Sequence, residues 1–311
     1  MKRRESAFAP HVRIGQRHGH EARFDNHEGG QMEQDLLRLD GRIVVVSGAG
    51  GGGLGTTVTR MAARAGATVI GVSRNQANLD QHLGPLVSQG LAVIPVAADV
   101  ETAAGVATVM DSVRNTRGDL HGLVSVVGGG TPPTWGPATD VSRENWRALF
   151  ARNLDSMFFI SQAVAARLRE QGRPGSLVAI SSITGLGAQP YNVAYGAAKA
   201  AVLSVVRTMA LELAASGIRV NAVAPGAMAS PASLLPPDPV LERRAIPMGR
   251  KGNVEEIAAT VLFLLSDMAT YMTGQCLTVD GGISLKWSHL AEDNTPVLVT
   301  NQAFLDAMKG V

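Results

Sequence analysis

Residues 42–55 read Arg42-Ile-Val-Val-Val-Ser-Gly-Ala-Gly-Gly-Gly-Gly-Leu-Gly55 and lead into a helical stretch over 56–65. The β-branched run from 42 to 47 shows no polar alternation, which is typical of a strand buried in a parallel sheet. Glycines after such a strand let the backbone approach a pyrophosphate, and the following helix offers unpaired N–H groups to the anion. This stretch therefore predicts a Rossmann-type dinucleotide fold, with a merely flexible glycine turn as the less favoured alternative.

Strand-like runs alternate with helical stretches along the rest of the chain. Such alternation predicts right-handed βαβ units that wind one doubly wound parallel sheet of about seven strands, with helices on both faces. We expect this α/β domain over 39–282, a disordered N-terminal extension over 1–38 and a C-terminal extension over 283–311. The predicted strands cover 42–47, 68–72, 91–97, 122–127, 176–181, 218–224 and 276–279.

Composition limits the classes of function. The chain has 311 residues, 45% of them apolar, and a net charge of +2, which indicates neither nucleic acid nor an anionic membrane as a partner. No run of about 18 apolar residues occurs, and the first thirty residues lack an apolar signal core, so we expect a cytoplasmic protein without a membrane span. The single cysteine, Cys276, has no ligand spacing around it, so neither a disulfide nor a metal site is expected.

The segment 1–31 is polar and has no helical or strand period. Its histidines are irregularly spaced and have no Cys or paired carboxylates beside them, which favours solvated disorder over a metal site. Met32 is a candidate for the natural start, a hypothesis that sequencing the N-terminus of the native protein tests. The segment holds four of the seven histidines, namely His11, His18, His20 and His27.

Tyr195 and Lys199 lie four positions apart, so a helix places both side chains on one face, one turn apart. A free tyrosine has a pKa near ~10, and proton transfer near neutrality requires a shift of roughly 3 units, which a neighbouring ammonium favours. Of 28 basic residues only five are Lys, and Lys199 is the only Lys between Lys2 and Lys251. The pair predicts a tyrosine that acts as general acid or base with the support of Lys199.

With this pair identified, several motifs resemble the short-chain dehydrogenase/reductase family over roughly Leu39 to Gly282. The family's glycine loop corresponds to Ser47-Gly48 and Gly53-Leu54-Gly55. Four residues instead of three separate its first two glycines here, which leaves open which amides meet which phosphate oxygens. The family's catalytic tetrad corresponds to Asn153, Ser182, Tyr195 and Lys199.

The resemblance implies a role for each member of the tetrad. Ser182 polarises the substrate carbonyl, Tyr195 delivers or accepts the proton, and Lys199 also holds the nicotinamide ribose. Asn153 holds a water in the proton path. Ser182 precedes Tyr195 by 13 residues, the family's usual spacing, which favours it over Ser181; a strand-end serine with a satisfied hydroxyl is the alternative.

One motif departs from the family. Ser125-Val126-Val127-Gly128 stands where the family has Asn-Asn-Ala-Gly. The missing Asn side chains normally tie the central sheet together, so we expect this support to come from elsewhere.

The choice of cofactor is predicted from charge. The strand 68–72 ends in Ser73-Arg74-Asn75, without the carboxylate that accepts from the ribose 2′-hydroxyl of NAD. Ser73 and Arg74 can hold a 2′-phosphate instead, so NADP(H) is expected over NAD(H); a solvated Arg74 that stacks on adenine in either cofactor is the alternative. The predicted cofactor contacts, several of them implied by the resemblance, are Gly48, Gly53, Leu54, Gly55, Ser73, Arg74, Asp99, Val100, Tyr195, Lys199, Pro225, Gly226 and Ser230.

The substrate and the assembly are less closely defined. The stretch 227–241, where the family keeps a substrate lid, is Pro-rich and apolar and favours an apolar ketone or alcohol. The Arg243-Arg244 pair that follows is either a docking point for an acyl carrier or, as the favoured reading, a solvated face. The helix over 195–215 is apolar nearly all round, which favours a second subunit, and the resemblance implies a homotetramer. We expect the tail, with Trp287 and the apolar run 296–300, to fold over a subunit surface.

These observations predict an oxidoreductase that transfers a hydride between NADP(H) and a carbonyl or secondary alcohol. A 3-oxoacyl-thioester reductase is the alternative within the same chemistry. A non-catalytic cofactor-binding protein on the same fold is the alternative from another class, and the intact tetrad disfavours it.

Overall fold

The computed structural model describes residues 36–130, 134–231 and 237–286, together with residues 290, 291, 293–295, 302, 303 and 306. The predicted N-terminal extension lies outside these residues except for 36–38. The same holds for Trp287 and the run 296–300 of the tail, and for the middle of the predicted substrate lid, 232–236.

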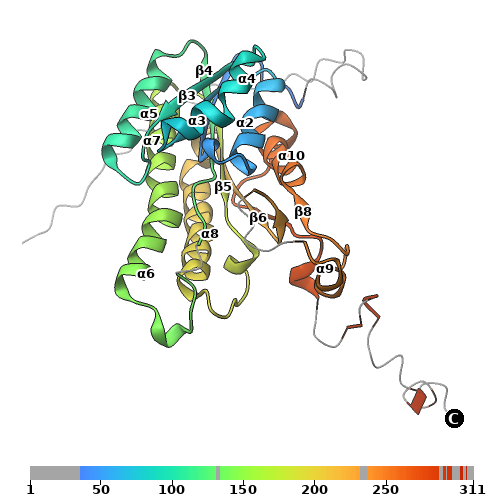
Figure 1. The fold of residues 1–311 in the computed structure, drawn as a ribbon. Helices are drawn as coiled ribbons and strands as arrows, with labels where there is room; N and C mark the ends of the chain where they lie inside the picture. Colours follow the sequence, from blue (N-terminus) through green and yellow to red (C-terminus); the bar gives the residue numbers. More distant parts are fainter. Residues whose placement is uncertain are drawn as a thin grey trace, which may run out of the picture.

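A seven-stranded sheet forms the centre of the molecule (Figure 1). All of its strand pairs are parallel, which confirms the predicted doubly wound α/β sheet. The chain winds outward in one direction from β1 to β3 and in the other from β4 to β9, so the β1–β4 pair is the topological switch point. In spatial order the strands are β3 (Val93–Ala97), β2 (Thr68–Ser73), β1 (Arg42–Ser47), β4 (Asp119–Ser125), β5 (Gly175–Ile180), β6 (Ile218–Pro225) and β9 (Cys276–Val279).

The predicted strands agree with the observed ones to within a few residues. The largest difference is at β4, which begins at Asp119 instead of 122 and pairs there with Arg42 of β1. The polar residues Asp119 and His121 made the start of this strand hard to recognise in the sequence. Polar residues are tolerated there because the amino end of a buried strand reaches solvent.

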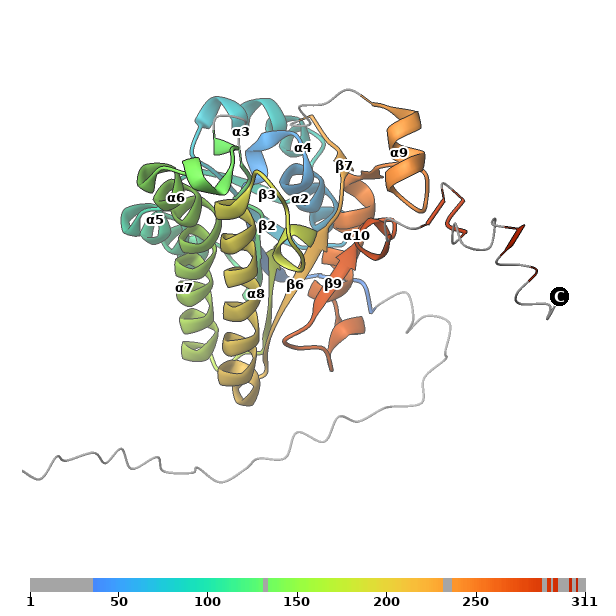
Figure 2. The same cartoon turned by 90° about the horizontal axis from the view of Figure 1, so that it is seen from below.

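Helices cover both faces of the sheet (Figures 1 and 2). Two buried apolar clusters, one on each face, hold the layers together. One face carries α5 (Ala103–Asn115), α7 (Ser156–Glu170) and α8 (Val193–Leu213), and the other carries α2 (Leu54–Arg64), α3 (Gln76–His82), α4 (Gly84–Ser88) and α10 (Val254–Leu265).

The central strand β1 shows why its sequence lacks polar alternation. Ile43 and Val45 point into the cluster with α5, α7 and α8, whereas Val44 and Val46 point into the cluster with α2 and α10. All four side chains are fully buried. A strand that is covered on both faces needs apolar residues at every position.

Short elements connect these layers. The π turn η4 joins α6 to α7 into one long helix, and the strand pair β7–β8 links the segment after β6 to the start of α10. Their bounds are η1 (Ala49–Gly51), η3 (Ala138–Asp140), α6 (Arg143–Phe150), η4 (Ala151–Asp155), η5 (Ile183–Gly185), η6 (Ala214–Ser216), β7 (Met228–Ala229), α9 (Pro239–Ala245), β8 (Gly252–Asn253), η7 (Asp267–Ala269) and η8 (Ile283–Leu285).

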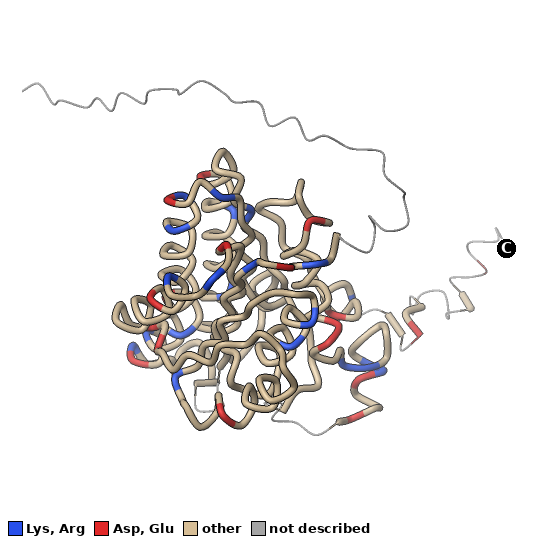
Figure 3. The backbone as a smooth tube through the Cα atoms, turned by 90° about the horizontal axis from the view of Figure 1, so that it is seen from above, with Lys and Arg blue, Asp and Glu red and all other residues tan. Residues whose placement is uncertain are grey.

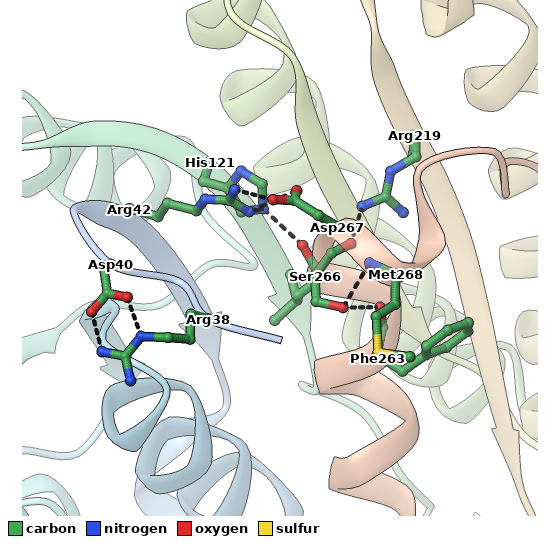
Figure 4. A network of polar contacts seen from close by, with 10 residues as sticks. Arg38, Asp40, Arg42, His121, Arg219, Phe263, Ser266, Asp267 and Met268 are labelled. Carbon is green, nitrogen blue, oxygen red and sulfur yellow. Dashed lines mark hydrogen bonds and ion pairs between the residues drawn. The ribbon is translucent and has the colours of Figure 1, made fainter. Parts of the chain in front are cut away.

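The edge where the parallel strands begin is here called the amino edge. Arginines of the sheet form hydrogen bonds there with residues at the end of α10 and directly after it (Figure 4). Arg42 of β1 makes two hydrogen bonds with Asp267, at 3.0 and 2.5 Å. Arg219 of β6 donates to the carbonyl oxygens of Leu264, at 2.8 Å, and Ser266, at 3.2 Å. The last carbonyls of a helix lack partners within it and form its negative pole, so a guanidinium there is doubly favourable.

Charged residues are spread over the described chain. Lys and Arg positions are interspersed with Asp and Glu positions (Figure 3). Within the described ranges, every helix is too short or too polar to cross a bilayer.

Candidate active site

Two adjoining cavities lie at the opposite edge, where the strands end, here called the carboxyl edge. The adenosine cavity, named for the part of the cofactor predicted there, measures about 360 Å³ and includes the ends of β2 and β3. The reaction cavity measures about 340 Å³ and includes the ends of β5 and β6. Both are lined by Gly48, Gly51, Val126 and Gly128, beside the switch point, where open α/β sheets bind their ligands.

The glycine loop forms the 3₁₀ turn η1 between Gly48 and Gly52. Gly48 and Gly52, on either side of this turn, have φ values of +85° and +67°, which favour glycine. Thr56 fixes the turn from α2: its hydroxyl accepts from Gly52 N–H at 3.0 Å and donates to the Ala49 carbonyl at 2.5 Å. A Cβ at Gly55 would collide with the carbonyl oxygen of Gly48, so α2 packs directly on the loop.

The loop is shaped to receive an anion. A Cβ at Gly50 would lie 2.8 Å from the Ser73 hydroxyl oxygen, so the loop contacts the end of β2. Among the described residues, a Cβ at Gly53 would have Pro231 as its one neighbour within 4 Å, at 3.9 Å, and Gly53 lines the reaction cavity. Gly53 offers no side chain to cap α2, which leaves the first N–H groups of this helix for a phosphate. The residues present therefore fit a dinucleotide pyrophosphate.

The predicted contacts at the adenosine end, Ser73, Arg74, Asp99 and Val100, all line the adenosine cavity. Arg74 is 59% exposed and its Nη1 lies 3.5 Å from Glu101 Oε1 and 4.0 Å from Asp99 Oδ2. β2 ends without a carboxylate, and two carboxylates come instead from the segment after β3. Asn78 and Arg152 also line the cavity from other elements, and the sequence did not indicate them.

The sequence pattern that could have indicated Glu101 is the acidic pair Asp99-x-Glu101, which closely follows a predicted strand. The ends of neighbouring parallel strands meet at one edge, so Asp99-x-Glu101 after β3 is adjacent to Arg74 after β2. No sequence pattern marks Arg152, which reaches the cavity from η4.

Ser182, Tyr195 and Lys199 come together in the reaction cavity. The Nζ atom of Lys199 lies 5.7 Å from the centre of the Tyr195 ring, and it donates a hydrogen bond to the Ile180 carbonyl at 2.9 Å. Ser182 accepts from Thr184 N–H at 3.2 Å, which leaves its hydroxyl hydrogen for its hydrogen bond with Tyr195. The same cavity is lined by the predicted contacts Gly53, Leu54, Gly55, Pro225, Gly226 and Ser230. It is also lined by Met228 and Val254, which the sequence did not indicate.

Burial dominates the electrostatics of this cavity. It raises the pKa of Tyr195 above its usual value of 10, and the hydrogen bond with Ser182 opposes that rise. It also lowers the pKa of Lys199 to about 8. The prediction that Lys199 lowers the pKa of Tyr195 is therefore wrong for the chain's own groups, because the ammonium faces the ring and a carbonyl, Lys199 is buried and Tyr195 is partly buried.

Asn153 is not among the residues that line the two cavities. Its Oδ1 accepts from Gly129 N–H at 2.7 Å, and its Nδ2 donates to the carbonyls of Gly129, at 3.1 Å, and Leu149, at 2.9 Å. A Cβ at Gly128 would lie 2.7 Å from Asn153 Oδ1 and 2.8 Å from Lys199 Nζ. The side chain thus braces the loop after β4, with both amide hydrogens committed to the backbone.

The hydrogen bonds of Asn153 are relevant to the departure from the family's Asn-Asn-Ala-Gly motif. Ser125, where the first Asn would stand, has a buried hydroxyl that makes no hydrogen bond within the described chain. Asn153 ties the loop after β4 to η4 and does not join one strand to another, so the expected replacement support for the central sheet stays a prediction.

The parallel sheet, the glycine loop at its switch point and the residues of the reaction cavity define a dinucleotide-binding oxidoreductase domain. A family model described as enoyl-(acyl carrier protein) reductase matches residues 48–284. The 3-oxoacyl-[acyl-carrier-protein] reductase of Thermotoga maritima is 34% identical over 249 residues, which are 79% of this chain and 99% of that protein.

Solved structures show the same likeness. A gluconate 5-dehydrogenase from Burkholderia cenocepacia, in complex with NADP and tartrate, is 30% identical with a TM-score of 0.76, over 82% of this chain and 100% of that one. A 7α-hydroxysteroid dehydrogenase in complex with NADH is 31% identical with a TM-score of 0.74, over 80% and 96% of the two chains. The chain belongs to the short-chain dehydrogenase/reductase family, and it is an NAD(P)-dependent enzyme that acts on alcohol or carbonyl groups.

Proposed function

We propose that residues 39–282 catalyse hydride exchange between NADP(H) and an apolar ketone or secondary alcohol, with Tyr195 as general acid or base. The observation that carries the proposal is the convergence of Ser182, Tyr195 and Lys199 on one cavity that adjoins the glycine loop. A general acid must lie within hydrogen-bond reach of the reacting oxygen, and the Ser182–Tyr195 pair offers two hydroxyls to a single carbonyl oxygen.

Each side chain has a separate part in the reaction. The Ser182 hydroxyl donates to the substrate oxygen, and the Tyr195 hydroxyl gives its proton in reduction or takes one in oxidation. When bound, the nicotinamide supplies or accepts the hydride, which is the cofactor's own chemistry. Lys199 holds its ammonium against the Tyr195 ring, near the predicted position of the ribose. Asn153 positions the loop after β4, whose Gly128 and Gly129 line the reaction cavity.

The preference for NADP(H) rests on the end of β2. Arg74 and Ser73 line the adenosine cavity, and β2 itself ends without an acid. A guanidinium suits a 2′-phosphate because its hydrogen bonds to that group are charge-assisted. The related gluconate 5-dehydrogenase was solved with NADP.

The preference for an apolar substrate rests on the loops that follow β4 and β5. Trp135, Leu186 and Tyr191 are large apolar side chains that stay about half exposed or more on these loops. Gly136 N–H donates to the Tyr191 carbonyl at 2.9 Å, so the two loops are joined. Exposed aromatic and aliphatic groups on loops that follow strands of the reaction cavity favour a substrate with an apolar body.

A 3-oxoacyl-thioester reductase is the second candidate. The Thermotoga maritima relative carries this name. Arg243 and Arg244 are exposed on α9, in the segment where the family keeps its substrate lid, and an acidic carrier protein would meet them there.

We also propose a homotetramer. The helices α7 and α8 lie side by side on one face of the sheet (Figures 1 and 2). Phe159 of α7 and Leu211 of α8 are exposed, the latter at 83%, and a second subunit would cover them. Light scattering tests this assembly, and a purely monomeric protein contradicts it.

The activity is tested with a panel of ketones, 3-oxoacyl thioesters and secondary alcohols, followed at the nicotinamide absorbance band with each cofactor. Turnover of free apolar ketones, faster with NADPH, supports the proposal. Turnover of thioesters alone favours the second candidate. Cofactor binding without any turnover across the panel contradicts both and favours a non-catalytic cofactor-binding protein.

A further inference from the structure

A carboxylate outside the predicted cofactor contacts faces Arg74 in the adenosine cavity. Glu101 Oε1 lies 3.5 Å from Arg74 Nη1, closer than Asp99 Oδ2 at 4.0 Å. The Glu101 side chain is 23% exposed, against 59% for Arg74. The Glu101 carboxylate is therefore more buried than the guanidinium that it faces, although β2, which precedes Arg74, ends without an acid.

The backbone fixes Glu101 in this position. Its N–H donates to Asp99 Oδ1 at 3.0 Å. The next residue, Thr102, donates through its hydroxyl to the Asp99 carbonyl at 2.9 Å and caps α5 by accepting from Gly105 N–H at 3.0 Å. A residue held between such a turn and a helix cap cannot leave without breaking these hydrogen bonds, so the backbone of Glu101 keeps its side chain at this end of the cavity.

The ion pair leaves Glu101 able to accept a further hydrogen bond. The contact with Arg74 lacks hydrogen-bond geometry, and Glu101 Oε1 is buried without a hydrogen-bond donor from the described residues. A buried carboxylate oxygen without a donor is costly, and a ribose hydroxyl is a donor that a bound dinucleotide brings.

The charges that line the adenosine cavity also balance. Arg74 and Arg152 are cationic, and Asp99 and Glu101 are anionic. A 2′-phosphate adds nearly two negative charges. Arg74 attracts this phosphate, whereas the Glu101 carboxylate next to Arg74 repels it.

We propose that Glu101 sets the balance between NADP(H) and NAD(H), an inference that rests on the proposed function. With NAD(H), its carboxylate accepts from the ribose 2′-hydroxyl and so replaces the acid that is missing at the end of β2. With NADP(H), Arg74 turns from Glu101 to the 2′-phosphate, and Glu101 opposes that phosphate by like charge. Glu101 therefore reduces the preference for NADP(H) that Arg74 confers.

The test is the dissociation constant of NADP⁺ and of NAD⁺, measured by calorimetry on the full chain and on Glu101→Gln. We expect NADP⁺ to bind about 10-fold more tightly to the variant, because a like charge close to the phosphate is removed. NAD⁺ should bind roughly 2-fold to 3-fold more weakly, because an amide oxygen accepts a hydrogen bond less strongly than a carboxylate. Binding is measured without substrate, so the result does not depend on turnover.

Two variants serve as controls. Arg74→Gln should weaken NADP⁺ about 10-fold and leave NAD⁺ nearly unchanged. Glu101→Asp keeps the charge but withdraws it by one methylene, so its ratio of the two constants should lie between those of the wild type and Glu101→Gln; it also tests the inference if Glu101→Gln does not fold.

Two outcomes overturn the inference, and they differ. If the wild type binds both dinucleotides and the ratio of their constants changes by less than about 2-fold in a folded Glu101 variant, the inference fails while the proposed function stands. If the wild type binds neither dinucleotide, the proposed function fails together with it.

Discussion

The two edges of the parallel sheet differ in how their polar groups are satisfied. At the amino edge, Arg42 pairs with Asp267, and Arg219 donates to the last carbonyls of α10 (Figure 4). At the carboxyl edge, the hydroxyls of Ser47 and Ser125 are buried without a hydrogen bond from the described residues. Unsatisfied buried groups cost stability, so these two hydroxyls beside the glycine loop and the loop after β4 mark a place where the molecule gives up stability for function.

The same difference holds for charged groups. Lys199, at the carboxyl edge, is buried and donates to the Ile180 carbonyl, its one hydrogen-bond partner among the described residues, and burial lowers its pKa. Arg42, at the amino edge, meets a carboxylate in two hydrogen bonds. We therefore expect substitutions at the carboxyl edge to change activity and binding, and substitutions at the amino edge to change stability alone.

The largest expected effect is that of Tyr195→Phe. Removal of the hydroxyl should lower kcat by about 10³-fold or more, because general acid or base catalysis contributes roughly 10² to 10⁴. The NADPH dissociation constant should change only a few fold, and the unfolding midpoint in urea should stay close to that of the wild type. Retained turnover would remove Tyr195 from the mechanism.

Lys199→Met should separate activity from stability. At pH 7 the variant lacks the cost of a buried ammonium, so its free energy of unfolding should rise by up to about 3 kcal/mol, while turnover falls. The folded pKa of about 8 lies below the unfolded value of 10.5, so the wild type gains stability as pH rises between them. Urea unfolding at pH 7 and above pH 10, without cofactor, measures both. A difference that persists at high pH would contradict the burial argument.

Asp267→Asn should lower stability without a change in kcat. The Asp267–Arg42 pair is only partly buried, so its loss should cost about 1 kcal/mol of unfolding free energy. A double-mutant cycle with Arg42→Gln isolates the pair, and steady-state kinetics on the same proteins supply the comparison. Reduced kcat at unchanged stability would show that the amino edge also serves the reaction.

The smallest expected effect is that of pH on His121, at the amino edge. Its Nε2 lies 2.8 Å from the Leu265 carbonyl, and burial, followed by the charge of Arg42, lowers its pKa below 6.5. The unfolded chain therefore takes up the proton first, so wild-type stability should fall as pH drops below about 6.5. His121→Gln keeps a donor for this carbonyl and should lose less stability between pH 7 and pH 5 in thermal melts. Equal losses would contradict the predicted titration.

The sequence by itself determined the sheet, the glycine loop and most of the cleft. Local signals were enough, because an apolar strand read from six consecutive residues must be covered on both faces. The ends of parallel strands also gather at one edge, so residues after β1, β2, β5 and β6 were correctly assigned to one region.

Only the tertiary structure decided how these residues meet. The Glu101–Arg74 contact joins two strand ends 27 positions apart, and the brace from Asn153 to Gly129 joins a π turn to a loop. The direction of the Tyr195 pKa shift was likewise beyond reach, because it depends on burial and on where the Lys199 ammonium points. Burial and distance between side chains are properties of the packed chain, and spacing along the sequence specifies neither.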